Sequence, residues 1–223
     1  LKEFESQKFS KNKTVTYGEL LADIKFDFKS SKLRGVYEEI LDTVACQLSL
    51  EFIYKQYNTH MKINIKKGGI HTILENKIYS KKEGYLYLSD DVGSLYPNVM
   101  IEYDCIRFPE VKEKFREKKE QRLIVKAQGD KQQDAALKLQ LNILSGLIDM
   151  EFSPFHFNEG AFRMRMIGQL IMLKCLDEVS QYEEFEVLAL NTDSIDSYIK
   201  ESHLDLYNRI IKMPKAQYKV NSE

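Results

Sequence analysis

The stretch LYLSDDVGSLYPNVM (Leu86–Met100) decides the fold, because it predicts a strand, a turn and the start of a helix in immediate succession. The strand GYLYLSD ends at Asp90 and Asp91, Gly93 allows a turn, and Pro97 suits the first turn of a helix. A carboxylate at a strand end is held rigidly yet reaches solvent, as a metal-binding oxygen must. The plain alternative is that these acidic and serine side chains only cap the helix.

A second acidic turn lies in LALNTDSIDSYIK (Leu188–Lys200), where the polar cluster NTDS separates two apolar strands. Asn and Asp tolerate the left-handed dihedrals of a tight hairpin, so a plain turn explains this segment as well as a functional site does. Asp193 and Asp196 are three residues apart, and at that spacing on an extended strand two side chains point to opposite faces. These two carboxylates are therefore not expected to share one ion.

Basic residues concentrate between Lys112 and Lys138, where nine Lys or Arg residues accompany five acidic ones. Arg122 and Lys126 are spaced i, i+4 for one helix face, and Lys138 and Asn142 repeat that spacing on the next predicted helix. Such a surface could hold a polyanion, although a basic run is more often a solvated helix face.

Composition limits the classes of protein to which the chain can belong. It has 223 residues, 43% of them hydrophobic, and a net charge of −1, which suits one globular domain with subdomains or two small ones. The near-neutral charge means that any nucleic-acid role must come from a local patch. No CxxC pair, signal-peptide pattern or membrane-spanning segment is predicted, so a cytoplasmic protein without disulfides or a thiolate zinc site is expected. The three cysteines are Cys46, Cys105 and Cys175.

The order of predicted elements indicates an α+β fold. Residues from Leu1 to about Thr59 are predicted to be helical, with Leu33, Val36, Ile40, Val44 and Leu48 at helical spacing. Strands MKINI, IHTIL and GYLYLSD follow, then a helical pair that breaks at Gly129-Asp130, a helix over 159–179, a strand hairpin and a last helix. Because the final two strands are joined tightly, the sheet is predicted to be antiparallel.

Taken in order, four of these stretches resemble the polymerase core of family B DNA polymerases, and most of all the phage enzymes, including the protein-primed type. The family's Asp-x-x-Ser-Leu-Tyr-Pro motif is complete from Asp91 to Pro97. Its Lys-x-x-x-Asn-x-x-Tyr-Gly motif appears as KLQLNILSG, and its Tyr-x-Asp-Thr-Asp-Ser motif as ALNTDS. KKGG resembles the glycine motif that precedes the palm in phage members. The resemblance covers roughly residues 65–200.

The resemblance implies an antiparallel palm sheet with packed helices and a short two-helix fingers hairpin. The expected divisions are a helical lead-in (1–60), the first part of the palm (61–110), the fingers (111–149), the second part of the palm (150–200), and the start of a thumb or a C-terminal helix (201–223). The chain resembles an excised core, because neither a proofreading exonuclease nor a full thumb is recognisable in it.

The resemblance also implies roles for individual residues. Two Mg²⁺ ions, or Mn²⁺ in their place, would be held by Asp91, Asp193 and the carbonyl of Val92. The incoming deoxynucleoside triphosphate would meet Ser94, Leu95, Tyr96, Arg122, Lys126, Lys138 and Asn142. Template-primer DNA would meet Gly68, Gly69, Gly146, Thr192 and Ser194. A terminal protein or other replication proteins are further partners of such enzymes, which act in the cytoplasm of the bacterial host.

Two departures from the family motifs weaken this implied function. Asn191 replaces the first aspartate of ALNTDS, so a neutral amide stands where the family has a negative charge. Ser145 replaces the tyrosine of the second motif and removes a ring beside the base pair. The alternative is a weak or inactive polymerase remnant that binds nucleic acid without catalysis. An unrelated metal nuclease would explain the carboxylates but not Tyr96-Pro97 or the Lys138–Asn142 pair.

Overall fold

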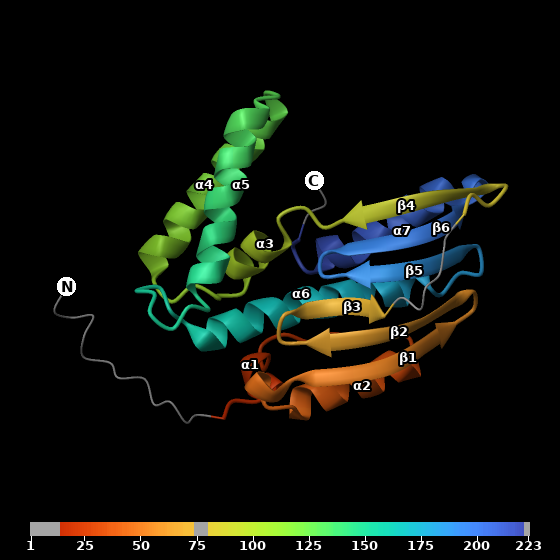
Figure 1. Ribbon diagram of the computed structural model, residues 1–223, viewed down its shortest axis with the longest axis horizontal. Helices are drawn as coiled ribbons and strands as arrows, with labels where there is room; N and C mark the ends of the chain where they lie inside the picture. Colours follow the sequence, from red (N-terminus) through yellow and green to blue (C-terminus); the bar gives the residue numbers. More distant parts are fainter. Residues whose placement is uncertain (1–13, 74–79, 221–223) are drawn as a thin grey trace.

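The protein has an α+β fold with a six-stranded antiparallel sheet, as the sequence predicts (Figure 1). The structure is a computed structural model that describes residues 14–73 and 80–220. The strands are β1 (Ser49–Gln56), β2 (Thr59–Lys66), β3 (Gly69–Ile73), β4 (Tyr85–Asp91), β5 (Phe185–Asn191) and β6 (Ser194–Lys200). The helices are α1 (Tyr17–Leu20), α2 (Ser31–Asp42), α3 (Leu95–Glu102), α4 (Pro109–Ala127), α5 (Lys131–Leu147), α6 (Asn158–Val179) and α7 (Leu204–Gln217), with short 3-10 turns η2 (Ala45–Gln47) and η3 (Glu201–His203).

The strand order is β1-β2-β3-β5-β6-β4, so the sheet consists of two halves. One half is the meander β1-β2-β3, and the other places β6 between β5 and β4. In the described residues, the register between β3 and β5 comprises a single pair, His71 with Asn191. Thr59 and Thr72 reinforce the junction, because their hydroxyls accept hydrogen bonds from the backbone N–H groups of Val187 and Leu190.

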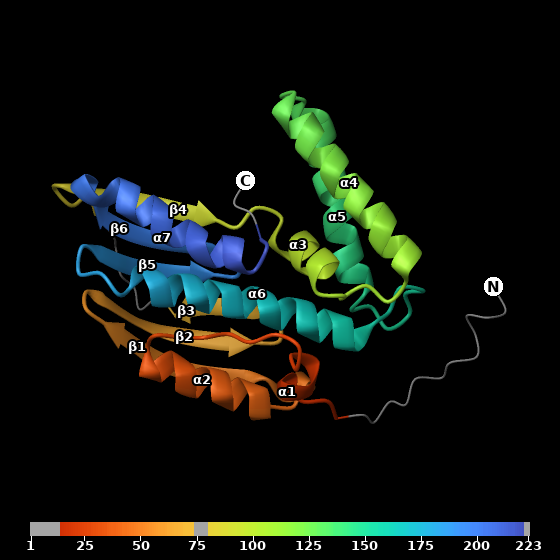
Figure 2. The same cartoon turned by 180° about the vertical axis from the view of Figure 1, so that it is seen from behind.

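Helices α2, α6 and α7 cover one face of the sheet, and the other face carries no helix from the described part of the chain (Figures 1 and 2). Helix α6 is the centre of the core, because it contacts α1, α3 and α7 as well as strands β3, β5 and β6. Several of its buried polar side chains have hydrogen-bond or ion-pair partners, which offset the cost of burying them. Gln169, for example, donates to the carbonyl of Lys66 at 3.0 Å.

The prediction that residues up to Thr59 are helical is wrong. Its first 13 residues lie outside the described residues, and helix α2 ends at Asp42, short of Val44 and Leu48. Strand β1 follows instead, with Phe52 and Tyr54 buried on alternate positions. Pairing with all of β2 outweighs the helical spacing, since a strand in a sheet is stabilised by partners far away in sequence.

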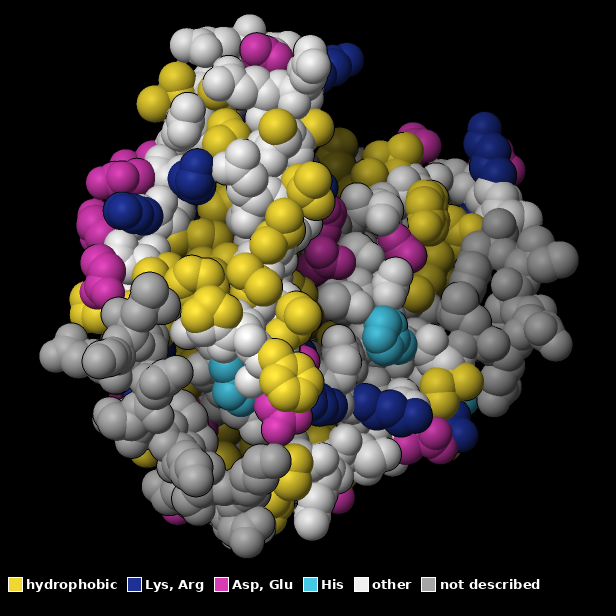
Figure 3. Space-filling view, turned by 60° about the vertical axis from the view of Figure 1, so that its left-hand side comes forward, with side chains coloured by type: hydrophobic (Ala, Val, Ile, Leu, Met, Phe, Trp, Pro, Cys, Tyr) yellow, Lys and Arg dark blue, Asp and Glu magenta, His cyan; other side chains and the backbone are white. Residues whose placement is uncertain are grey.

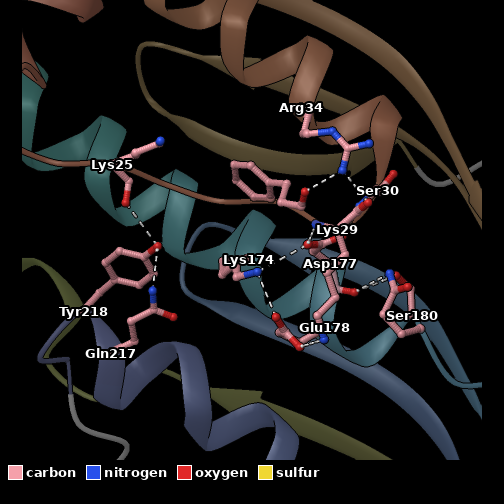
Figure 4. Close-up of polar contacts among 12 residues, drawn as sticks. Lys25, Lys29, Ser30, Arg34, Lys174, Asp177, Glu178, Ser180, Gln217 and Tyr218 are labelled. Carbon is pink, nitrogen blue, oxygen red and sulfur yellow. Dashed lines mark hydrogen bonds and ion pairs between the residues drawn. The ribbon is translucent and has the colours of Figure 1, made fainter.

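A cluster of charged side chains docks the N-terminal segment on α6 (Figure 4). The carboxylate of Asp177 is fully buried and accepts hydrogen bonds from the backbone N–H groups of Lys29 and Ser30, at 2.6 and 3.0 Å. Lys174 lies 3.4 Å from Asp177 and 2.8 Å from Glu178, which also pairs with Lys29. Asp177 thereby binds the N-terminal end of α2 across the core.

Helices α4 and α5 form a hairpin that projects away from one end of the sheet (Figure 1). Gly129 allows the turn with a φ of 78°, and Asp130 begins α5 by accepting a hydrogen bond from the N–H of Gln133. The predicted break at these two residues is confirmed. A two-helix hairpin has too few neighbours to bury all its apolar side chains. Leu139 is accordingly 61% exposed and Ile143 is 50% exposed.

None of the helices in residues 14–73 and 80–220 combines the length and apolar character needed to cross a lipid bilayer.

Candidate active site

Asp91 and Asp193 lie beside each other where β4 ends and β5 turns into β6. Asp91 pairs in register with Ser194, and the N–H of Val92 donates to the carbonyl of Asp193 at 2.8 Å. Burial raises the pKa of the Asp193 carboxyl, the negative charge of Asp91 raises it further, and Lys138 lowers it in part. The two carboxylates are therefore close enough to repel each other, and a cation between them would relieve that repulsion.

The turn that carries Asp193 has an unusual backbone conformation. Thr192 has a φ of 51°, which is rare for a β-branched residue. Its N–H donates to the carbonyl of Ile70 at 2.8 Å, and a Cβ on Gly69 would lie only 3.2 Å from its Oγ1 atom. The second glycine of KKGG is thus buried and supports the acidic turn. Gly68 is exposed.

The two carboxylates line a cavity of about 100 Å³, which we call the carboxylate cavity. It lies between the start of α3, the α4–α5 hairpin and the end of the sheet, and Figure 3 shows acidic side chains in the hollow between hairpin and sheet. Its lining brings together residues from three of the four stretches singled out in the sequence, and it consists of Asp91, Val92, Gly93, Ser94, Leu95, Tyr96, Pro97, Arg122, Lys138, Leu141, Asn142 and Asp193. The side chains of Val92 and Leu95 belong to the core.

The basic residues predicted at the site differ in their placement. Lys138 is exposed and lines the carboxylate cavity opposite the acids, with Asn142 one turn further along α5. Arg122 also lines it but is nearly buried, pairing with Asp134 of α5 at 2.8 Å and contacting the hydroxyl of Ser94. Lys126 is exposed near the far end of α4 and is not part of this lining. The i, i+4 spacing therefore does not bring Lys126 to the site with Arg122.

A second cavity of about 350 Å³, the side cavity, adjoins the first and shares Tyr96 and Asn142 with it. Its other lining residues include Gly68, Ser145, Gly146 and Thr192, together with Asp149, Met150, Met164 and Arg165. Ser145 is held in place, because its hydroxyl donates to the carbonyl of Asn142 at 2.7 Å. Ser194 similarly donates to the carbonyl of Asn191 at 3.2 Å.

Sequence reasoning missed the charged residues of the side cavity. Arg165 on α6 pairs with Asp149 at 3.0 Å, and Lys67 of KKGG lies 3.8 Å from the same carboxylate. Burial alone would raise the pKa of Asp149, but the hydrogen bond and charge of Arg165 and the charge of Lys67 bring it below its usual value. Asp149 lies three residues beyond KLQLNILSG and Lys67 lies within KKGG, so both were within reach, whereas nothing in the α6 sequence distinguishes Arg165.

Tyr96 forms the wall between the two cavities and packs on a glycine that the sequence did not single out. A Cβ on Gly168 of α6 would lie 3.1 Å from Cε1 of Tyr96 and 3.4 Å from Cδ2 of Leu95. Burial, with a smaller contribution from the charge of Asp193, raises the pKa of the Tyr96 hydroxyl to about 12. Tyr96 therefore stays neutral, and its ring packs closely against α6 at Gly168.

The carboxylates of Asp91 and Asp193 are oxygen donors of the kind that a divalent cation uses. Among the described residues there is no group of three or more His, Cys, Asp or Glu side chains placed to hold a metal. Two carboxylates are what Mg²⁺ commonly uses when phosphates and water complete its coordination. Asn191 contributes no charge, and its amide oxygen lies 3.0 Å from Nδ1 of His71. Asp196 is on β6 beside Tyr87 and is not part of the carboxylate-cavity lining.

A scan of the sequence against protein-family models finds no match, and neither does a search of curated proteins.

Proposed function

We propose that the protein is a DNA-directed DNA polymerase core that adds deoxynucleotides to the 3′-hydroxyl of a primer. The observation that carries the proposal is the carboxylate cavity, whose lining combines Asp91 and Asp193 with Lys138, Arg122 and Tyr96. Two carboxylates and two basic side chains in one cavity suit a polyphosphate substrate that binds together with divalent cations. The α4–α5 hairpin would be the fingers and the sheet the palm.

The proposed chemistry requires control of charge more than it requires a protein nucleophile. In phosphoryl transfer, negative charge shifts onto phosphate oxygens and the attacking and leaving oxygens lie roughly in line. Lys138 would neutralise the incoming triphosphate. Arg122 would hold α4 in place through Ser94 and Asp134, with its guanidinium in the lining of the same cavity. Mg²⁺ bound by Asp91 and Asp193 would lower the pKa of the primer hydroxyl and stabilise the pyrophosphate that leaves.

The walls of the two cavities suggest how the nucleotide and the DNA would be oriented. The ring of Tyr96 would lie under the sugar and leave no room for a 2′-hydroxyl, which favours deoxynucleotides. Asn142, Ser145 and Gly146 would border the new base pair in the side cavity. Gly68 would meet the template, and Thr192 and Ser194 would flank the primer end. The partners are then template-primer DNA and deoxynucleoside triphosphates, in the cytoplasm of a bacterial host.

The second candidate is a polymerase-derived domain that binds nucleic acid without catalysis. It is favoured by Asn191, whose amide is held by His71 and brings no third negative charge to the site. The two candidates make opposite predictions about primer extension.

Primer extension by the protein with Mg²⁺, compared with the Asp193→Asn variant, tests the proposal. Loss of several kcal/mol of charge stabilisation should slow extension at least about 100-fold, since each factor of ten is about 1.4 kcal/mol. Asp196→Asn is the matched control, because it removes a carboxylate from the same hairpin outside the carboxylate cavity. Equal extension by the protein and Asp193→Asn would refute the proposal, and no extension by either would favour the second candidate.

A further inference from the structure

A pocket lined by tyrosine and lysine lies at the opposite end of β4 from Asp91. It has a volume of about 430 Å³, and its lining consists of Ser80, Lys81, Lys82, Tyr85, Tyr87 and Tyr198. We call it the Tyr–Lys pocket. Tyr87 of β4 stands opposite Tyr198 of β6. The next pair on the same face, two residues closer to Asp91, is Ser89 with Asp196. None of these residues belongs to the carboxylate cavity or the side cavity.

The pocket is on the face of the sheet that no described helix covers. Asp90 lies on the covered face, because its carboxylate accepts a hydrogen bond from Tyr207 of α7 at 2.7 Å. Side chains alternate along a strand, so Tyr87 and Asp91 share the opposite, open face. A ligand lying along the open face could therefore reach from the carboxylates to Tyr87 without crossing the sheet.

The walls of the Tyr–Lys pocket are rigid on one side and accessible on the other. Tyr198 is 8% exposed and its hydroxyl donates to the carbonyl of Ser80 at 2.6 Å, which fixes its ring. Tyr87 packs edge-on against Tyr198, with 6.1 Å between ring centroids, yet it is 55% exposed. An exposed aromatic side chain held in position by a buried one is suited to pack against a flat or curved ligand surface.

The charges at the pocket favour an anionic ligand at its lysine end. The Nζ atom of Lys82 lies 4.0 Å from the centroid of the Tyr85 ring and 3.5 Å from a carboxylate oxygen of Glu186. Lys81, next in the chain, also lines the pocket, so its lysine end carries two positive charges against the one negative charge of Glu186. Asp196 lies on the Tyr87 side, so an anion would be repelled there and attracted towards the two lysines.

The distance along β4 determines how far from Asp91 an anion bound in the Tyr–Lys pocket would lie. At about 3.3 Å per residue, Tyr87 lies about 13 Å and Tyr85 about 20 Å from Asp91. Successive phosphates of one DNA strand advance about 3.4 Å along the helix axis, so this interval corresponds to about four to six base pairs. A duplex whose primer end is at Asp91 and Asp193 would bring its backbone to the Tyr–Lys pocket if it ran along the open face.

We propose that the Tyr–Lys pocket binds the sugar-phosphate backbone of the newly made DNA duplex, about four to six base pairs behind the primer end. Lys81 and Lys82 pair with a phosphate, and the exposed ring of Tyr87 packs against the adjoining sugar. This inference rests on the proposed function, because the polymerase reaction sets where the duplex starts. Contacts of this kind hold any sequence equally well, as a replicating enzyme requires.

The test measures binding of a fluorescent primer-template by anisotropy, without nucleotide or Mg²⁺, for Tyr87→Ala and Lys82→Ala. Both variants should bind the duplex several-fold more weakly than the protein does, and Lys82→Ala should reduce the salt dependence of binding by about one ion. Lys32→Ala is the matched control, since Lys32 also lies over an aromatic ring, that of Phe52 at 5.7 Å, but on α2 behind the sheet. It should bind the duplex as the protein does.

A duplex with neutral methylphosphonates about four to six positions behind the primer end locates the contact. It should bind the protein more weakly than unmodified DNA, and a variant carrying both Lys81→Ala and Lys82→Ala should bind both duplexes equally. The inference would be overturned if the lysine substitutions and the neutral backbone weakened binding independently, so that their effects added. Undiminished duplex binding by both Tyr87→Ala and Lys82→Ala would also overturn it, as would variants that bind single-stranded DNA more weakly but the duplex equally well. Binding is measured without catalysis, so a failed primer extension with intact pocket-dependent binding would refute the proposed function alone.

Discussion

The amide oxygen of Asn191 lies 3.0 Å from Nδ1 of His71, and among the described residues these two form the one pair in register between β3 and β5. The imidazole N–H donates this bond, because an amide oxygen can only accept. Asn191 is therefore a structural residue of the sheet junction as well as the neighbour of the acidic turn. The junction keeps its hydrogen bond without a third negative charge beside Asp91 and Asp193.

Asn191→Asp should increase the affinity of the site for Mg²⁺. A third carboxylate adds charge where two already converge, and the Mg²⁺ concentration that half-saturates primer extension should fall, by about tenfold for each 1.4 kcal/mol gained. Asn64→Asp is the matched control, because Asn64 also stands opposite His71 on the sheet but lines neither cavity. An unchanged Mg²⁺ requirement in Asn191→Asp would show that position 191 does not reach the cation.

Gly168→Ala should displace the ring of Tyr96 and weaken selection against ribonucleotides. The new Cβ would lie 3.1 Å from Cε1 of Tyr96, and such overpacking costs about 1–3 kcal/mol. Gly35→Ala in α2, where a Cβ meets nothing within 4 Å, should instead stabilise the protein by about 0.5–1 kcal/mol. Urea unfolding and the ratio of deoxynucleotide to ribonucleotide incorporation measure the two effects. Unaltered selectivity in Gly168→Ala would contradict the role of the ring.

Arg122→Met should destabilise the protein by about 3–5 kcal/mol, because it leaves the Asp134 carboxylate without its partner in a largely buried pair. Adding Asp134→Leu should restore much of the stability, since the unpaired charge is then gone. The double variant should still extend primers poorly, because it lacks the guanidinium that lines the carboxylate cavity and contacts Ser94. Full recovery of both stability and extension would mean that Arg122 is only structural.

The Asp193 carboxylate should destabilise the metal-free protein at neutral pH. Its pKa is raised in the folded state by burial and by Asp91, so the folded state holds that proton more tightly and loses stability as pH rises through the raised pKa. Asp193→Asn should therefore unfold at a higher temperature than the protein at pH 7 without divalent cations. The difference should shrink as pH falls towards the ordinary aspartate value of 3.8.

Mg²⁺ should reverse that order, because it binds the protein and not Asp193→Asn. Asp196→Asn should respond to Mg²⁺ as the protein does. A protein that is more stable than Asp193→Asn at pH 7 without Mg²⁺ would show that the two carboxylates do not repel each other.

Those parts of the fold that depend on neighbours in sequence were predictable. Gly129 and Asp130 mark the hairpin turn, and the strand ending at Asp91 is followed by helix α3 as its sequence indicates. Strand β1 was missed because Val44 and Leu48 continue the helical spacing of α2 up to its first residue, and only pairing with β2 distinguishes the two structures. Local patterns do not contain that pairing.

The motif residues of the candidate site were predictable from the sequence, and the residues that contact them from other elements were not. Asp91, Asp193, Tyr96 and Lys138 follow from motif register, and the structure brings them to one cavity. Gly168, Arg165 and His71 lie in other elements, and they reach the site only because α6 and the sheet junction fold against it. The spacing of Arg122 and Lys126 was misleading because Lys126 lies one turn further along α4, exposed and outside the carboxylate-cavity lining.

The most direct test of the carboxylate pair is anomalous diffraction from crystals soaked with Mn²⁺ and a deoxynucleoside triphosphate. The proposed function predicts a peak about 2 Å from carboxylate oxygens of both Asp91 and Asp193, with the triphosphate extending towards Lys138. Crystals of Asp193→Asn should lose or weaken it, and crystals of Asp196→Asn should keep it. Nucleotide bound without a peak between Asp91 and Asp193, or a peak that Asp193→Asn leaves unchanged, would contradict the proposed function.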